Sequence, residues 1–192
     1  MTRWQPLPLL LLGAALGCFR PSPPVAYYTL PPVPRAGAPL APSGIALEVM
    51  PVRLPELLQR PQMLVAQGAG ALALSETQRW GNPLDQDMRR ALVDDLRWEL
   101  GSDAVVASPY GDRVAAAYRL EVEVLSCAAR PSELVLEASW MVTRPGSARA
   151  LVVRRSALRE PLAPGPEALA AAHSRILAAL GREIAAELLK RP

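Results

Sequence analysis

An apolar run that ends on a cysteine near the N-terminus is the feature that most limits what this chain can be. Residues 9 to 18 read LLLLGAALGC and follow a positive charge at Arg3. The run is shorter than the roughly 20 apolar residues that span a bilayer, and it lies where an export signal lies. Residues 1–17 are therefore predicted to be a signal peptide.

The cysteine itself has a predicted role. Residues Ala15 to Cys18 resemble the bacterial lipobox, in which a cysteine is acylated and becomes the new N-terminus. We therefore predict that Cys18 carries covalent acyl chains, and we expect no other cofactor and no metal. The alternative is an ordinary secretory signal cut nearby, which leaves Cys18 as a thiol or as half of a disulfide with Cys127.

Residues 18–43 are so rich in proline that neither a helix nor a central strand is expected there. A polyproline-type chain rises about 3.1 Å per residue, so this stretch is predicted to be a tether with a reach of up to roughly 75 Å. Within it, Tyr27 and Tyr28, followed by Thr29 and Leu30, have the composition of a strand. Two interpretations stay open: the island docks on a sheet edge, or it is a stray aromatic pair in a disordered linker.

Size and charge limit the rest of the chain. Of the 192 residues, about 150 remain once the leader and tether are removed, which predicts a single domain over residues 44–192. The net charge of the whole chain is only +3, so no large basic field is available for nucleic acid. Nucleic acid is therefore not an expected partner.

Hydrophobic periodicity predicts the elements of this domain. The expected order is a strand at 45–50, a hairpin at 63–74 around glycines 68–70, a helix at 83–100, a short strand at 104–108, a hairpin at 118–142, a strand at 150–158 and a helix at 166–190. Asn82 is expected to cap the first helix, and Gly101 is expected to end it. The predicted fold class is mixed α+β, a largely antiparallel mixed sheet packed by two amphipathic helices.

The same patterns give little support to catalysis. Asp94, Asp95 and Glu99 are expected to be solvated helix charges. The one histidine, His173, lies on the apolar stripe of the last helix, which leaves metal pairs and histidine-based triads without partners. Cys127 lies in a strand as an expected buried thiol, with no neighbouring histidine in sequence, although the fold can still bring His173 to it. No catalytic residue is predicted.

Several short segments, taken in order, resemble one family. They are Tyr27 to Leu30, LPELLQRPQMLV at 54–65, Arg79-Trp80 with Pro83-Leu84, the strand around Trp140, and LGREIAAEL near the end. Together with the lipobox they resemble the ABC-type transport auxiliary lipoproteins of the PqiC type. Gln59 and Leu57 depart from the family pattern, which has an acidic residue and often an aromatic residue there. The expected partner or edge-strand contacts are Tyr27, Tyr28, Arg60 and Arg79, and the expected structural residues are Trp80 and Trp140.

The resemblance implies a periplasm-facing lipoprotein of the outer membrane that works with a mammalian-cell-entry (MCE) type lipid transport system. Its implied partner is an MCE-domain protein, its implied role is non-catalytic docking, and self-assembly into a homo-oligomer is compatible with that role. Phe19 follows Cys18 where aspartate would resemble an inner-membrane retention signal, so the outer membrane is favoured. The alternative is a lipid-carrying lipoprotein, or an accessory lipoprotein of another envelope assembly machine.

Overall fold

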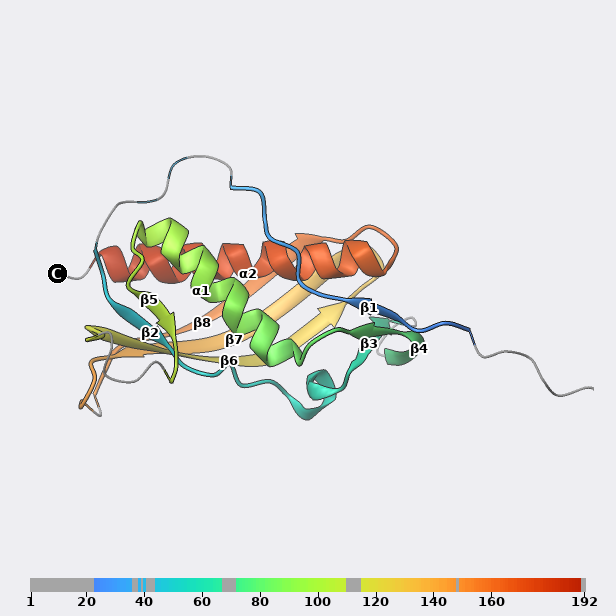
Figure 1. Cartoon of the computed structure of the whole chain (residues 1–192), viewed down its shortest axis with the longest axis horizontal. Coiled ribbons are helices and arrows are strands. Elements are labelled where there is room, and N and C mark those ends of the chain that lie inside the picture. The colour runs from blue at the N-terminus through green and yellow to red at the C-terminus, as the bar shows by residue number, and fades with distance from the viewer. Residues whose placement is uncertain are drawn as a thin grey trace, which may run out of the picture.

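The fold is a layer of helices on a sheet, with a second sheet at one end. The computed structural model describes residues 23–35, 38, 40, 44–66, 72–109, 115–147 and 149–190. In these residues two α-helices cover one face of a five-stranded sheet, and a three-stranded sheet lies at one end of the molecule (Figure 1). The elements, in chain order, are β1 (Ala26–Tyr28), β2 (Leu47–Val49), η1 (Glu56–Gln59), β3 (Gln62–Ala66), β4 (Leu72–Trp80), α1 (Leu84–Leu100), β5 (Val105–Ala107), β6 (Tyr118–Ala129), β7 (Glu133–Thr143), β8 (Ala150–Pro161) and α2 (Pro166–Leu189).

The two sheets differ in how their strands run. The five-stranded sheet has the order β5-β2-β6-β7-β8, in which β2 is parallel to both neighbours and β6, β7 and β8 are antiparallel. The small sheet has the order β1-β4-β3, with an antiparallel β3–β4 pair and β1 parallel to β4. The predicted mixed α+β class is confirmed. The prediction of one sheet was incomplete, because β1, β3 and β4 form a sheet of their own.

Strand alternation places the core between the large sheet and the helices. On β6 the buried residues are Tyr118, Leu120, Val122 and Val124, and on β7 they include Leu134, Leu136, Ala138 and Trp140. These are the residues that the period of two predicts for one face. The Trp140 ring is 1 % exposed, and its Nε1–H donates to Ser156 Oγ at 2.9 Å, so its one polar group is satisfied.

Helix α1 ends as predicted but begins differently. Gly101 adopts the left-handed conformation at φ 53°, and its N–H reaches the Trp98 carbonyl at 3.1 Å. At the other end Pro83, not Asn82, is the cap residue, because its ψ of 125° keeps it outside the helix. The Asn82 side chain instead donates to Asp87 Oδ1 at 3.1 Å. The prediction that Asn82 caps the helix was wrong.

Two of the three acids predicted to be solvated on α1 are buried. Asp95 is 4 % exposed and Glu99 is 8 % exposed, whereas Asp94 is exposed as expected. The reason is the close approach of α2: a Cβ at Gly181 would lie 3.1 Å from the Cβ of Asp95. The absence of a side chain at residue 181 therefore lets α2 pack closely enough to bury this part of α1.

Part of the predicted tether is packed on the domain. β1 pairs with β4, Leu30 is 5 % exposed in the core, and Arg35 reaches α1. We call residues 26–35 the N-terminal strap, which Figure 1 shows in blue between the small sheet and the helices. Of the two interpretations left open for Tyr27 to Leu30, the β1–β4 pairing supports docking on a sheet edge, and the docked segment continues to Arg35. Residues 18–22 lie outside the described residues.

Trp80 joins the small sheet to the helices, and its removal tests how much this junction contributes. Its ring is 6 % exposed and meets His173 of α2 edge to face, with centroids 5.2 Å apart. Trp80→Ala is expected to lower the free energy of unfolding by about 3 to 5 kcal/mol, because a buried aromatic leaves a cavity. Urea unfolding measures this, with Trp98→Ala at a half-buried position as the control. Equal losses in both variants would contradict a special role for Trp80.

Candidate functional site

The small sheet places two of the predicted contact residues side by side on its outer face. In register, Tyr27 of β1 lies opposite Arg79 of β4, which lies opposite Gln62 of β3. Tyr28 and Trp80, one residue further, point to the core side because successive side chains alternate. Tyr27 is 65 % exposed, so the outer face presents a phenol ring beside an arginine.

A glycine allows β1 to approach this closely. The N–H of Gly81 donates to the Tyr28 carbonyl at 2.7 Å, which continues the β1–β4 pairing past the end of β4. A Cβ at residue 81 would lie 3.2 Å from Cγ2 of Thr29 and 3.5 Å from the Tyr28 carbonyl oxygen. Any larger side chain at residue 81 therefore pushes against the strap.

The far end of the strap is fixed by Arg35. Its Nη1 donates to Asp95 Oδ1 at 2.7 Å, and its Nη2 donates to the Asp94 carbonyl at 2.9 Å. The guanidinium also lies over the Trp98 ring, 5.7 Å from the ring centre. Three contacts to one helix thus hold the strap along α1.

Burial dominates the electrostatics of this contact. It raises the pKa of Asp95 to about 6, although the Arg35 guanidinium lowers that pKa and the charges of Asp94 and Glu99 raise it further. Arg35 therefore offsets only part of the cost of placing a carboxylate between two helices. Near neutral pH the ionised Asp95 depends on the strap for its charge partner.

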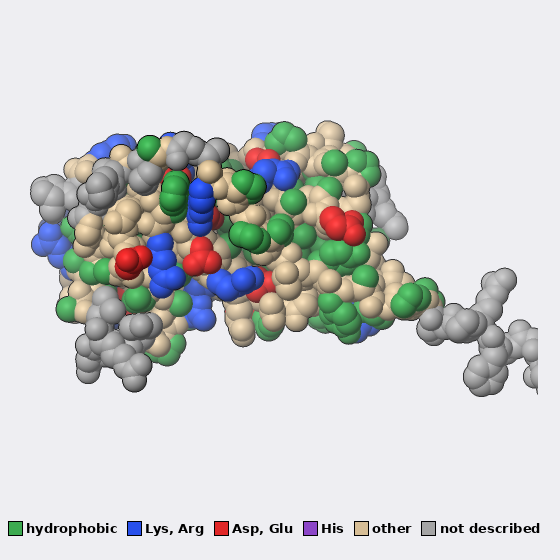
Figure 2. Space-filling view, turned by 45° about the horizontal axis from the view of Figure 1, so that its top comes forward, with side chains coloured by type: hydrophobic (Ala, Val, Ile, Leu, Met, Phe, Trp, Pro, Cys, Tyr) green, Lys and Arg blue, Asp and Glu red, His purple; other side chains and the backbone are tan. Residues whose placement is uncertain are grey.

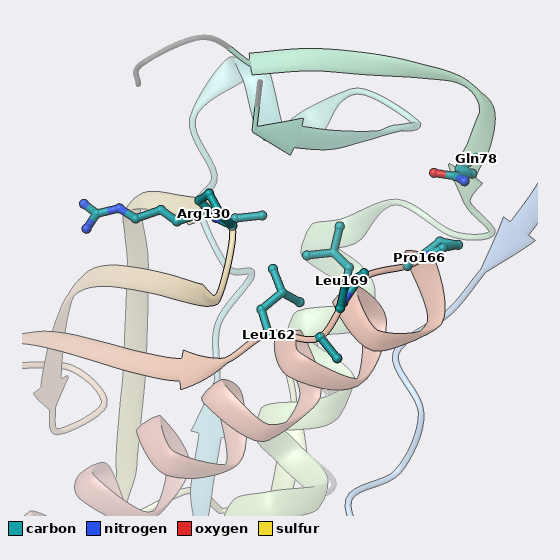
Figure 3. Close-up of a pocket in the computed structure, with 10 residues that line it drawn as sticks. Gln78, Arg130, Leu162, Pro166 and Leu169 are labelled. Atoms are coloured by element: carbon teal, nitrogen blue, oxygen red, sulfur yellow. The ribbon is translucent and has the colours of Figure 1, made fainter. Parts of the chain in front are cut away.

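A pocket of about 240 Å³ opens beside the small sheet (Figure 3). Gln78, which lines it, is the register partner of Ala26, the first residue of β1. Arg130 lies at its other side, and apolar side chains form most of the wall between them. The lining residues are Gln78, Ala129, Arg130, Pro131, Leu162, Ala163, Pro164, Gly165, Pro166 and Leu169.

The fold brings Cys127 and His173 together behind this pocket. A register shift in β6 between Val124 and Ser126 turns Cys127 toward the helices. Its Sγ lies 3.5 Å from His173 Nε2, while His173 Nδ1 lies 2.9 Å from the Leu169 carbonyl. A carbonyl only accepts, so Nδ1 carries the proton, and Nε2 accepts from the thiol. Sequence reasoning left this proximity open, and the bulge that creates it has no clear signal in the residues.

The pair has the properties of a core contact. Burial raises the pKa of the Cys127 thiol to about 12 and lowers the pKa of His173 to about 4. A catalytic thiolate needs the opposite shift for its cysteine. Both groups are therefore neutral near pH 7, and the thiol has no activated form there.

The remaining predicted residues are placed as follows. Arg60 is exposed at the end of η1, two residues before Gln62, and no contact joins it to Tyr27 or Arg79 in the described part of the chain. The Arg79 side chain is half-buried, with an Nε that has no hydrogen-bond partner among the described residues. Cys18 lies outside the described residues.

The sequence analysis missed one contact, the ion pair between Arg35 and Asp95. Nothing near Arg35 in the sequence distinguishes it from other linker arginines. The burial of Asp95 could have been predicted from the sequence, because Asp95 lies three residues after Leu92 and therefore beside the apolar stripe of α1.

The residues that the structure describes contain neither a metal-binding cluster nor a membrane-spanning helix. Among them no group of three or more histidine, cysteine, aspartate or glutamate side chains is arranged to hold a metal ion. No helix within the same residues is long and apolar enough to cross a membrane.

The surface of the helix layer is divided by chemistry. Figure 2 shows acidic and basic side chains lying close together over part of this face, and hydrophobic side chains gathered toward the end that carries the small sheet. Exposed Val25 and Tyr27 belong to that end. The pocket of Figure 3 opens there as well, since Gln78 pairs with Ala26.

Comparisons with known proteins identify relatives of this fold. A family model described as "ABC-type transport auxiliary lipoprotein component" matches residues 28–185. A crystal structure of an uncharacterized protein is similar with a TM-score of 0.71 at 21 % identity, covering 86 % of this chain and 99 % of the other. The protein XCC0632 of the DUF330 family, from Xanthomonas campestris, has a TM-score of 0.65 at 18 % identity, covering 86 % and 94 %. No curated protein matches the sequence.

His173 and Asp95, whose pKa values are shifted in opposite directions, make opposite contributions to stability in acid. Between pH 6.5 and about 4 the unfolded chain binds a proton at His173 that the folded protein does not, so acidification destabilises the fold. Between about pH 6 and 3.8 the folded protein binds a proton at Asp95 that the unfolded chain does not, so acidification stabilises it. Each contribution amounts to roughly 3 kcal/mol.

Paired variants separate these contributions. As pH falls from 7 to 4, the unfolding free energy of His173→Phe is expected to rise relative to that of the parent by up to roughly 3 kcal/mol. The unfolding free energy of Asp95→Asn is expected to fall relative to the parent by a similar amount over the same range. Urea unfolding at pH 7, 6, 5 and 4 measures both slopes. Parallel slopes for all three proteins would contradict the assigned protonation states.

Proposed function

This chain belongs to the family of ABC-type transport auxiliary lipoprotein components, and we propose that it is an outer-membrane lipoprotein acting as a docking component of an MCE-type lipid transport system. Acyl chains on Cys18 hold it on the periplasmic face of that membrane. The domain has no chemistry of its own in this proposal and serves to join a membrane to an MCE-domain protein.

The observation that most supports docking over lipid carrying is the size of the pocket. At about 240 Å³ it falls below the roughly 300 to 1,000 Å³ of ordinary ligand pockets. A groove of about 500 Å³ runs along α1, but Asp87, Arg89, Arg90 and Arg97 line it. Neither hollow suits two acyl chains, because one is small and the other is charged.

The shifted pKa values of the Cys127–His173 pair support a role without catalysis. With a thiol pKa of about 12 and an imidazole pKa of about 4, the thiol is not ionised at neutral pH and the imidazole is too weak a base to deprotonate it. The pair packs against Trp80 through the His173 ring and contributes to the core.

The β8 edge offers a surface for a protein partner. β8 is 12 residues long, pairs with β7 on one side only, and ends the five-stranded sheet. Its Val153 is 60 % exposed. An edge of this kind receives a partner strand through main-chain hydrogen bonds, either from an MCE-domain protein or from a second copy of this chain.

Crosslinking in intact cells tests the proposal. A photoreactive residue at Val153 is expected to capture a protein with an MCE domain, identified by mass spectrometry, and the same residue at exposed Glu76 of β4 is the matched control. In the Cys18→Ser chain the domain is expected to fold but to leave the membrane fraction, because acyl chains provide about 0.8 kcal/mol per buried CH₂. Capture is then expected to be lost.

Other outcomes favour the alternatives. Capture of a protein from another envelope assembly machine would replace the MCE assignment with that system. A monomer that captures no protein and co-purifies with lipid would favour a carrier. Retention of the Cys18→Ser chain in washed outer membranes would contradict anchoring by acylation.

A further inference from the structure

We infer that the small-sheet end of the domain lies against the lipid surface and that the opposite end, where α2 finishes, is the end presented to partners. The membrane-facing surface comprises Val25, Tyr27 and Arg79 together with the mouth of the pocket at Arg130, Pro164 and Pro166. This inference rests on the proposed anchor at Cys18 and adds an orientation to it.

The stretch of chain between Cys18 and β1 is short. Ala26, the first residue of β1, is eight residues after Cys18. A fully extended chain of that length spans at most about 26 to 29 Å. Ala26 is paired with Gln78, which lines the pocket, so the pocket mouth is held within a similar distance of the acylated residue.

β1 is firmly attached to the rest of the domain. A three-residue parallel strand is a weak element alone. Here Leu30 is buried in the core, Gly81 bonds the Tyr28 carbonyl, and Arg35 pairs with buried Asp95. The strap therefore fixes the point at which the anchor-bearing chain leaves the domain.

The domain is longer than the connection between Cys18 and β1 can reach. α2 begins at the pocket and has 24 residues, so it is about 36 Å long. This length exceeds the reach from Cys18 to Ala26. An upright domain with the far end of α2 at the membrane would place the pocket about 36 Å away, beyond what the eight-residue connection spans even when fully extended.

The exposed side chains at the small-sheet end suit contact with the apolar part of a lipid surface. Val25 is 39 % exposed and Tyr27 is 65 % exposed, and tyrosine favours the boundary between lipid and water. Arg130 is already paired with Glu133 at 3.1 Å, so little unpaired positive charge is available at the pocket. Apart from Arg79, this surface offers little attraction to anionic lipid, so the contact depends mainly on the short connection and on apolar side chains.

Depth-sensitive quenching of the acylated full chain tests this orientation. The chain carries Cys127→Ala and one fluorophore, at Pro164→Cys beside the pocket or at Asp103→Cys beyond the C-terminal end of α1. It is reconstituted in phosphatidylethanolamine–phosphatidylglycerol vesicles that contain lipids with a nitroxide in the headgroup. Quenching is expected to be several-fold stronger at residue 164 than at residue 103. Equal quenching, or stronger quenching at residue 103, would overturn the inference.

A longer connection provides the matched control. Inserting about 20 Gly and Ser residues ahead of Pro23 adds roughly 70 Å of extended reach without touching the strap. Quenching at residue 164 is expected to fall markedly, and unchanged quenching would show that connection length does not set the orientation. Flotation with the vesicles is checked first: a chain that does not float contradicts the anchor and this inference together. A chain that floats without the expected difference contradicts this inference alone.

Discussion

The close crossing of α1 and α2 at Gly181 is the constraint on which the rest of the structure depends. Because residue 181 has no side chain, α2 approaches to the point where a Cβ would lie 3.1 Å from the Cβ of Asp95. This approach removes Asp95 from water, and a buried carboxylate is costly without a charge partner. Arg35 supplies that partner from a segment 60 residues earlier. This helix crossing thus creates one of the contacts that position the N-terminal strap, beside the β1–β4 pairing and buried Leu30.

The path of that chain changes how the anchored protein is understood. A free linker over residues 18–43 would let the domain move up to roughly 75 Å from the membrane. With the strap docked and the proposed anchor at Cys18, only the residues between Cys18 and Ala26 would contribute, and the reach would fall to about 26 to 29 Å. In this account the domain is a component held at the lipid surface, and its partner must extend to that surface. This geometry suits a docking role better than a role that needs the domain to cross the periplasm.

Local patterns predicted much of the fold, but the candidate site depends on contacts between distant residues. Trp140 and its neighbours on β7 follow a strict alternation, and the stripe of α2 through Ile176, Leu180 and Ile184 follows helical spacing, so both were predictable. The separate small sheet was not, because the parallel pairing of β1 with β4 joins residues about 50 positions apart. The Arg35–Asp95 pair was not predictable for the same reason, because its residues are 60 positions apart. The side of the sheet on which Cys127 lies depends on a bulge, and a shift of one residue reverses every following side chain.

Neutron reflectometry of the acylated protein on a supported bilayer tests the central claim most directly, because it measures the water layer between the headgroups and the domain. The account predicts that protein density begins at the headgroups, with any hydrated gap thinner than the roughly 29 Å that eight extended residues span. A clear water layer of roughly 50 to 75 Å, the reach of a free linker, would contradict it.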